Sequence, residues 1–217
     1  MAVKAFLFDL NGTMIDDMRF HIKAWHGILN SLGAELSMER ARLECYGKND
    51  ELLERIFPGR FSADEKQAMG IAKERQYQED FRPLLKLIEG LPQFLEKARE
   101  RGIRMAIGSA AIMFNVDFVL DGLDLRRYFD TIVSADHVSE SKPDPETWLA
   151  CADLLNIPCS DCLVFEDSPK GVEAAERAGM HSIAITTLHS REEFARHPNI
   201  RFCIDDYTDP QLDRLFQ

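Results

Sequence analysis

The 217-residue chain lacks a long apolar run, and this absence bears on where it acts. No stretch approaches the roughly 18 consecutive apolar residues that a membrane-spanning helix requires. The N-terminus also lacks the charged-then-apolar layout of a signal peptide and enters directly into a strand pattern. We therefore expect no membrane association, and we expect the protein to be cytoplasmic.

The chain is also short of basic residues relative to acidic ones. It has 26 Lys and Arg against 37 Asp and Glu, which gives a formal net charge of -11. Such a chain is repelled by anionic membranes and by phosphate backbones, so we expect no nucleic-acid partner. The charge is compatible with a small-molecule substrate.

Paired cysteines are missing as well. Five cysteines at irregular spacings suit a reducing compartment better than a disulfide framework. Cys159 and Cys162 have CxxC spacing, but no second pair or nearby histidine completes a zinc set. A chain of this size, 45% hydrophobic, needs neither disulfides nor a structural metal to build its core.

Six short apolar segments are typical of buried parallel strands. They are Ala5–Phe8, Ile103–Ile107, Thr131–Ser134, Cys162–Phe165, Ser182–Ile185 and Arg201–Ile204. The helical patterns between the later strands are Leu91–Arg101, Val116–Leu123, Glu146–Leu155 and Lys170–Ala178. Strands that alternate with helices predict an α/β fold, with a parallel sheet covered on both faces.

Residues 15–86 differ, because they carry amphipathic helical patterns and no convincing strand. The candidate helices are Asp16–Leu32, Ser37–Cys45, Asp50–Phe57 and Ser62–Phe81. Ser37 is predicted to cap the second of them. We therefore predict an all-helical domain, residues 15–86, inserted into a core domain made of residues 1–14 and 87–217.

Polar side chains follow four of the predicted strands. Asp9 follows the first strand, Ser109 the second, Lys142 the third, and Glu166 with Asp167 the fourth. Each residue alone is more simply a cap, turn or surface residue, but ligands of an open α/β sheet bind beyond the carboxyl ends of its strands. Carboxylates suit Mg²⁺, a lysine and a serine suit phosphate oxygens, and an aspartate can act as a nucleophile. We therefore expect these five side chains to converge.

Four motifs and a cap signature carry a resemblance to a known family. The motifs are Phe8-Asp9-Leu10-Asn11-Gly12-Thr13, Gly108-Ser109, Ser141-Lys142-Pro143-Asp144-Pro145 and Phe165-Glu166-Asp167-Ser168-Pro169-Lys170-Gly171-Val172. The cap signature is Asp17, His21 and Ala24-Trp25. Over nearly its whole length the chain resembles the haloacid dehalogenase-like (HAD) phosphohydrolases, specifically the β-phosphoglucomutase-like group. The resemblance implies a Rossmann-like core that carries the chemistry and a helical cap domain that selects the substrate.

The resemblance also implies a role for each candidate residue. Asp9 would attack phosphorus and form an aspartyl phosphate, and Ser109 and Lys142 would bind the phosphoryl group. The Mg²⁺ ligands would be Asp9, Glu166, Asp167 and the main-chain carbonyl of Asn11. Further phosphate contacts would come from Leu10, Asn11, Thr13 and Ala110. Substrate contacts in the cap would come from His21, Lys48 and Asn49; the simpler alternative for Asn49, or for Asp50, is a helix N-cap.

Position 11 departs from the family, which usually has an aspartate there as general acid–base. Asn11 cannot take up or release a proton at neutral pH, and such catalysis is worth on the order of 10²–10⁴-fold in rate. We therefore expect an intact metal and phosphate site with weakened turnover on phosphate esters. Three explanations stay open: a native asparagine with a substrate that needs little protonation, such as an acyl phosphate or pyrophosphate; a substitution introduced to trap a complex; or a proton supplied by Asp17 or His21.

The sequence thus predicts a Mg²⁺-dependent hydrolase, a phosphatase that acts on a small phosphorylated metabolite through an aspartyl phosphate, and we expect a monomer. Mutases of this group use a cap arginine to hold a second phosphate. Here no arginine aligns clearly, since Lys48 is the nearest cation and Arg55 lies one turn past Glu51. The alternatives are a β-phosphoglucomutase-type sugar phosphate mutase and a phospholigand-binding protein that has lost turnover.

Overall fold

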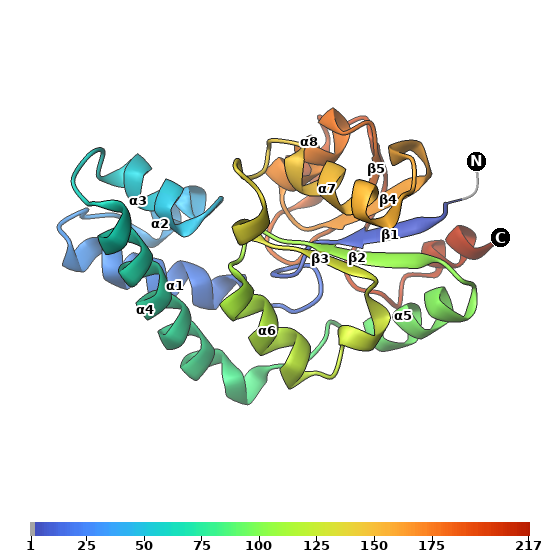
Figure 1. The fold of residues 1–217 in the computed structure, drawn as a ribbon, viewed down its shortest axis with the longest axis horizontal. Helices are drawn as coiled ribbons and strands as arrows, with labels where there is room; N and C mark the ends of the chain where they lie inside the picture. The colour runs from blue at the N-terminus through green and yellow to red at the C-terminus, as the bar shows by residue number, and fades with distance from the viewer. Residues whose placement is uncertain (1–2) are drawn as a thin grey trace. The chain divides into compact units, whose positions relative to one another are not determined.

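The structure, a computed structural model, describes residues 3–217. Six strands of this part of the chain form a parallel sheet (Figure 1). The strands lie side by side in the order β3-β2-β1-β4-β5-β6. In chain order they are β1 Ala5–Phe8, β2 Arg104–Gly108, β3 Thr131–Val133, β4 Cys162–Glu166, β5 His181–Ile185 and β6 Ile200–Ile204. The predicted α/β fold is confirmed, and every strand boundary lies within one residue of its predicted position.

Helices cover both faces of the sheet. They are α5 Leu91–Glu100, α6 Met113–Gly122, α7 Glu146–Leu155, α8 Pro169–Arg177 and the short α9 Arg191–Phe194. Figure 1 shows α5 and α6 below the sheet and α7 and α8 above it. This arrangement buries the central strand β1 from both sides, and its four residues are 0% exposed.

The side chains of β1 alternate between two different cores. Phe6 and Phe8 belong to an aromatic core, in which the Phe8 and Phe165 rings stack with their centroids 4.8 Å apart. The other rings of this core are those of Phe94, Phe129, Tyr207 and Phe216. The opposite core lies against α7 and α8 and includes Ala5, Leu7, Trp148, Cys151, Ala174 and Ala175.

Helix α6 begins at Met113, three residues before the predicted start at Val116. The residue before it is Ile112, which offers no capping side chain. A distant residue supplies the missing acceptor, because Asp136 Oδ2 accepts from the Met113 N–H at 2.7 Å. A partner 23 positions away is invisible to a local helix-start pattern, which explains the shorter prediction.

Residues Asp17–Leu85 form a compact unit of their own, whereas the residues up to Asp16 and Lys86–Gln217 form the unit that contains the sheet. The helices of the smaller unit are α1 Met18–Ser31, α2 Met38–Glu44, α3 Asn49–Ile56 and α4 Ala63–Phe81. Trp25 and Leu29 of α1 pack against Leu52 and Leu53 of α3. No helix among the described residues has both the length and the apolar character needed to cross a membrane.

The N-terminal caps of the smaller unit bear out one prediction and correct another. The Ser37 hydroxyl accepts from the Arg40 N–H at 3.1 Å and caps α2, as predicted. Helix α3 begins at Asn49, so the N-cap is Lys48, and the alternative that Asn49 or Asp50 is the N-cap is wrong. Glu51 explains the difference, because its carboxylate accepts from the Lys48 N–H at 3.0 Å and satisfies that donor from within the helix.

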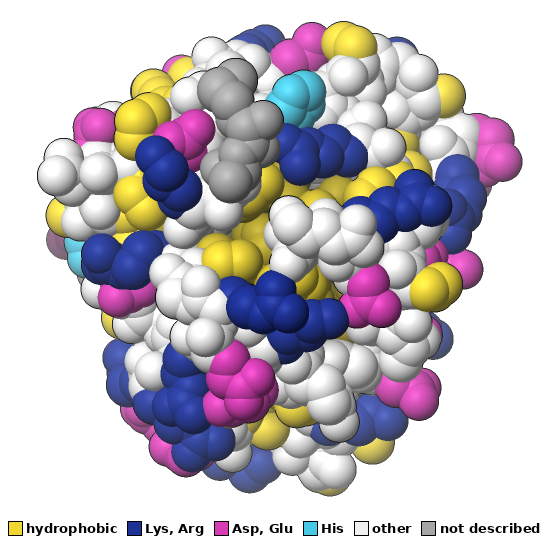
Figure 2. All heavy atoms as spheres, turned by 90° about the vertical axis from the view of Figure 1, so that its right-hand side faces the viewer, with side chains coloured by type: hydrophobic (Ala, Val, Ile, Leu, Met, Phe, Trp, Pro, Cys, Tyr) yellow, Lys and Arg dark blue, Asp and Glu magenta, His cyan; other side chains and the backbone are white. Residues whose placement is uncertain are grey.

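The end of the sheet that carries the amino ends of the strands has a mixed surface. Figure 2 shows Lys, Arg, Asp, Glu and apolar side chains interspersed on that face. Exposed ion pairs such as Lys97–Asp213, at 2.6 Å, contribute little to stability because water screens them.

Gly90 offers a stability test of the packing at the start of α5. Its φ is +79°, and a Cβ there would lie 2.5 Å from the Tyr207 carbonyl carbon. Gly102 has a similar φ of +69°, but no atom of the described residues lies within 4 Å of the place that its Cβ would take. We expect Gly102→Ala to cost about 1 kcal/mol of unfolding free energy from backbone strain, and Gly90→Ala about 3 kcal/mol from strain plus overpacking, both measured by urea unfolding. Equal losses in the two variants would contradict this packing.

Candidate active site

Three carboxylates gather where the two central strands end. Asp9 follows β1, and its N–H donates to the Phe165 carbonyl at 3.0 Å. Glu166 is the last residue of β4, and Asp167 follows it. One oxygen of each carboxylate lies within 4.8 Å of the others, and the three residues are only 7%, 1% and 4% exposed. Acids that are buried so close together require compensating positive charge.

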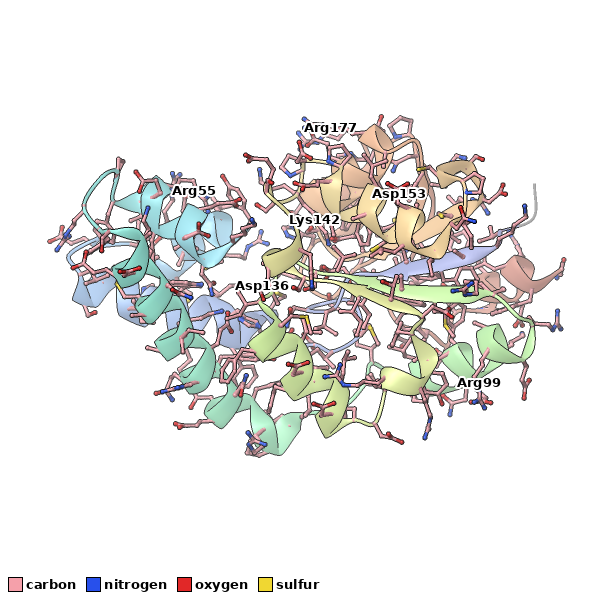
Figure 3. The ribbon with its side chains drawn as sticks, in the orientation of Figure 1. Arg55, Arg99, Asp136, Lys142, Asp153 and Arg177 are labelled. Atoms are coloured by element: carbon pink, nitrogen blue, oxygen red, sulfur yellow. The ribbon has the colours of Figure 1, made fainter. Side chains whose placement is uncertain are left out.

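Lys142 supplies part of that charge from the loop between β3 and α7. Its Nζ donates to Asp9 Oδ1 at 2.7 Å, to Glu166 Oε1 at 2.8 Å and to the Gly108 carbonyl at 3.0 Å. Figure 3 shows Lys142 at the carboxyl ends of the strands. Burial by itself would lower the pKa of Lys142, but Asp9 and Glu166 outweigh burial and hold the pKa above its ordinary value. The lysine therefore stays charged at neutral pH.

Trp148 and two glycines, Gly108 and Gly171, pack around Lys142 and Glu166. The Trp148 ring of α7 is 0% exposed, and the Lys142 Nζ lies 4.1 Å from its centroid. A Cβ at Gly108 would lie 2.6 Å from Trp148 Cζ3, and a Cβ at Gly171 would lie 1.8 Å from Glu166 Oε1. Both positions therefore require glycine, because the tryptophan and the glutamate occupy the space that a methyl group would fill.

Glu166 is oriented by a second set of contacts. Its Oε2 accepts from the Ser168 N–H at 2.7 Å and from the Ser168 hydroxyl at 3.0 Å. Its Oε1 accepts from Lys142, so the carboxylate is held from both sides. Its role as a metal ligand stays a prediction, while its contact with Lys142 is a direct observation.

Ser109 and Ala110 lie where β2 ends, next to the Gly108 carbonyl that Lys142 binds. Ser109 is 1% exposed, and its hydroxyl oxygen accepts from the Ala111 N–H at 3.1 Å. That bond uses one lone pair and leaves the hydroxyl proton available as a donor. The predicted phosphate contacts of Ser109 and Ala110 stay predictions.

The loop after β1 carries Leu10, Asn11 and Thr13, the other predicted phosphate contacts. Gly12 has a φ of +81°, and its N–H donates to the Ile15 carbonyl at 2.8 Å. That N–H is thus used within the loop. The Thr13 hydroxyl donates to Asp167 Oδ1 at 3.4 Å, a long contact that places Thr13 beside the acidic cluster.

His21 takes part in a buried network within the smaller unit. Lys73 Nζ lies 2.6 Å from His21 Nδ1, and Asp17 Oδ2 lies 3.2 Å from His21 Nε2. An ammonium group can only donate, so Nδ1 accepts and we assign the ring proton to Nε2, which donates to Asp17. The Tyr77 hydroxyl also donates to Asp17, at 2.5 Å. Asp17 and His21, the candidate proton donors, are therefore already bonded to each other inside this unit.

Asn49, another predicted cap contact, connects to the same network. Asn49 Nδ2 donates to Glu74 Oε1 at 3.0 Å, and Lys73 donates to the same oxygen at 3.0 Å. Burial by itself would raise the pKa of Glu74, but its neighbours, the Lys73 ammonium first among them, hold that pKa below its ordinary value. Substrate contact by His21, Lys48 and Asn49 stays a prediction.

The CxxC pair lies elsewhere, because Cys162 begins β4 at the amino end of the sheet. Burial raises the pKa of Cys162 to about 12, so its thiol stays protonated and unreactive at neutral pH. These cysteines belong to the packed structure.

The acidic cluster has the chemistry of a divalent-cation site. Three carboxylates against one ammonium leave an excess of negative charge, and carboxylate oxygens are the ligands that Mg²⁺ prefers. The residues present therefore fit a hard divalent cation.

Known proteins resemble this chain over most of its length. A family model described as haloacid dehalogenase-like hydrolase matches residues 6–185. The chain belongs to the haloacid dehalogenase-like hydrolase family. Within this family, the fructose-1-phosphate phosphatase YqaB of Escherichia coli (strain K12) is 32% identical over 184 residues, which are 84% of this chain and 96% of that protein. The β-phosphoglucomutase of Bacillus subtilis (strain 168) is 28% identical over 190 residues, 84% of this chain and 83% of that protein.

Solved structures show the same fold for this hydrolase. The β-phosphoglucomutase from Clostridium difficile superposes with a TM-score of 0.85 at 24% identity, over 99% of this chain and 97% of that chain. The predicted resemblance to the HAD family and its β-phosphoglucomutase-like group is confirmed.

Sequence reasoning missed Trp148, Lys73 and Tyr207. Each is buried and contacts a candidate residue or its loop. Trp148 had a usable signal, since it lies six positions after Lys142 on a helix that must return over the site. Lys73 and Tyr207 stand in ordinary helical and C-terminal patterns that give no local sign of their contacts.

A double-variant cycle tests the steric pairing of Gly108 with Trp148. We expect Gly108→Ala to displace the indole and, with it, the Lys142 ammonium, so kcat/KM should fall about 10–100-fold. Trp148→Phe should be milder, because it adds no methyl group that displaces the ring. In the double variant the smaller ring lacks atoms that the methyl group of Gly108→Ala would otherwise meet. The double variant should regain activity relative to Gly108→Ala, with a coupling energy of about 1–3 kcal/mol. Strictly additive losses would show that the two residues do not compete for space.

Proposed function

We propose that this hydrolase is a Mg²⁺-dependent phosphatase that acts on a small phosphorylated metabolite through an aspartyl phosphate on Asp9. The observation that carries the proposal is the Lys142 ammonium, which lies 2.7 Å from Asp9 and 2.8 Å from Glu166 while Asp167 completes the acidic cluster. A nucleophilic carboxylate, a cation for phosphoryl oxygens and a set of hard metal ligands occupy one edge of the sheet.

In the first step a carboxylate oxygen of Asp9 forms a bond to phosphorus and the bond to the leaving oxygen breaks. In the second step a water oxygen attacks the same phosphorus, which releases inorganic phosphate and restores the Asp9 carboxylate. Lys142 offsets the repulsion between the phosphoryl group and the carboxylates. Asp9, Asp167, Glu166 and the Asn11 carbonyl would hold Mg²⁺, which when bound would neutralise charge on the phosphoryl oxygens.

Asn11 limits the proton transfers in both steps, because an amide is neither an acid nor a base at neutral pH. The leaving oxygen must then take its proton from water, and the attacking water must lose its proton to solvent. This favours substrates whose leaving group is stable without protonation, such as acyl phosphates or pyrophosphate.

Hydrolysis is favoured over the mutase alternative by the position of Arg55. Its guanidinium donates to the Glu44 carboxylate at 3.1 Å and to the Glu44 and Tyr46 carbonyls at 2.7 and 3.0 Å. The Arg55 guanidinium carbon Cζ also lies 3.8 Å from the Tyr46 ring centroid. An arginine engaged in this way serves the loop before α3 and is poorly suited to hold a second phosphate. Relatives named as phosphatases, including the hexitol phosphatase B of Escherichia coli (strain K12), make a sugar phosphate the first substrate class to test.

The deciding experiment is a substrate panel run on the chain and on Asn11→Asp. We expect Asn11→Asp to raise kcat on sugar phosphates by roughly 10²–10⁴-fold and to change hydrolysis of acetyl phosphate much less. Phosphate release with and without Mg²⁺ is the measurement. Asn156→Asp is the matched control, because Asn156 is an exposed helix C-cap and the change adds the same charge elsewhere.

Three results would contradict parts of this proposal. An unchanged rate on sugar phosphates in Asn11→Asp would remove the assigned role of position 11. Conversion of a sugar 1-phosphate without phosphate release would show a mutase, and tight binding without turnover in both chains would show a binding protein.

A further inference from the structure

Two side-chain hydroxyl groups donate to successive carbonyls of the loop after β1. Thr187 Oγ1 donates to the Gly12 carbonyl at 2.6 Å, and the Tyr207 hydroxyl donates to the Thr13 carbonyl at 3.2 Å. The donors are 175 and 194 positions away along the chain. They belong to the loops that follow β5 and β6.

The Thr187 contact spans the acidic cluster. Strand β4 lies between β1 and β5, and the Glu166 and Asp167 carboxylates lie at its end. A hydrogen bond from the loop after β5 to the loop after β1 must therefore pass over that end. The contact therefore joins the two loops that flank the end of β4, where Glu166 and Asp167 lie.

Aromatic packing explains the ring of Tyr207 but not its hydroxyl group. The ring is 5% exposed and packs near Phe94 and Phe165, with centroid distances of 5.5 and 5.9 Å, and a phenylalanine would serve that packing equally well. A buried hydroxyl without a partner is unfavourable, so its bond to the Thr13 carbonyl accounts for the tyrosine. Burial, together with Asp9 and Asp167, holds the pKa of Tyr207 well above its ordinary value, so the hydroxyl remains a donor.

The loop needs such support because of Gly12. Its φ of +81° is open to glycine at little cost, and glycine also has more alternative conformations than other residues. The Gly12 N–H points to the Ile15 carbonyl, and the N–H and C=O of one trans peptide point in opposite directions. The Asn11 carbonyl, which shares that peptide, is therefore directed away from Ile15, and the next two peptides are those that Thr187 and Tyr207 hold.

We propose that Thr187 and Tyr207 are positioning residues that fix the loop carbonyls and thereby aim the Asn11 carbonyl at the divalent cation. The proposal rests on the proposed function, because it takes the acidic cluster as the cation site. Neither residue touches the substrate in this account. Both act through the main chain of Gly12 and Thr13.

The test is calorimetric titration of Mg²⁺ into the full chain, without substrate. Thr187→Val and Tyr207→Phe each remove a hydroxyl and keep the shape of the side chain. We expect each to weaken Mg²⁺ binding about 3–10-fold and the double variant about 10–100-fold, the range found for partners that orient metal ligands. Thr187→Ser, which keeps the hydroxyl, should restore most of the affinity.

The matched controls are Thr186→Val and Tyr128→Phe. Each also removes a hydrogen-bonded hydroxyl, but Thr186 bonds to Ile204 and Asp205, and Tyr128 bonds to Glu96. Both controls should bind Mg²⁺ as the unaltered chain does. If Tyr207→Phe does not fold, the comparison of Thr187→Val with Thr187→Ser decides the matter.

Mg²⁺ affinity in Thr187→Val and Tyr207→Phe equal to that of the controls would overturn the positioning role and leave the proposed phosphatase intact. No Mg²⁺ binding by the unaltered chain would overturn both proposals together. A loss that Thr187→Ser does not restore would assign the effect to packing and would also overturn the positioning role.

Discussion

The Lys142 ammonium between Asp9 and Glu166 is the interaction on which the rest of the site depends. Its loss would leave the buried Asp9 and Glu166 carboxylates without this ammonium, and breaking such a buried ion pair costs about 3–5 kcal/mol. The parallel pairing of β1 with β4 places two of these acids side by side, and the loop before α7 brings the lysine to them. The parallel sheet therefore brings negative charges together at the carboxyl ends of its strands, and the loop before α7 supplies the compensating positive charge.

The space around this ion pair explains several otherwise ordinary residues. Gly108 and Gly171 have no side chain because Trp148 and Glu166 occupy the volume next to them. The Trp148 indole in turn donates to the Gly171 carbonyl at 3.1 Å, which ties α7 to the start of α8 beneath Lys142. The position of the Lys142 ammonium thus depends on closely packed neighbours whose size can change little.

Sequence patterns could locate the strands and the polar residues at their ends, because strand length, burial and strand-end chemistry are local properties. They could not locate Thr187 or Tyr207, since the contacts of these residues join positions far apart in the chain. The same limit explains the start of α6, which depends on Asp136. The cap at Lys48 was missed for a different reason, because the Glu51 carboxylate replaced the side-chain cap that the pattern favours.

The central claim is that Asp9 becomes the phosphorylated residue. The most direct measurement is to incubate the chain with acetyl phosphate and Mg²⁺, quench with acid, reduce with borohydride and identify the modified residue by peptide mass spectrometry. The account predicts reduction of Asp9 itself, with a larger trapped fraction than in Asn11→Asp because Asn11 cannot activate the attacking water. Modification of another residue, or phosphate release with Asp9 unmodified throughout, would contradict it.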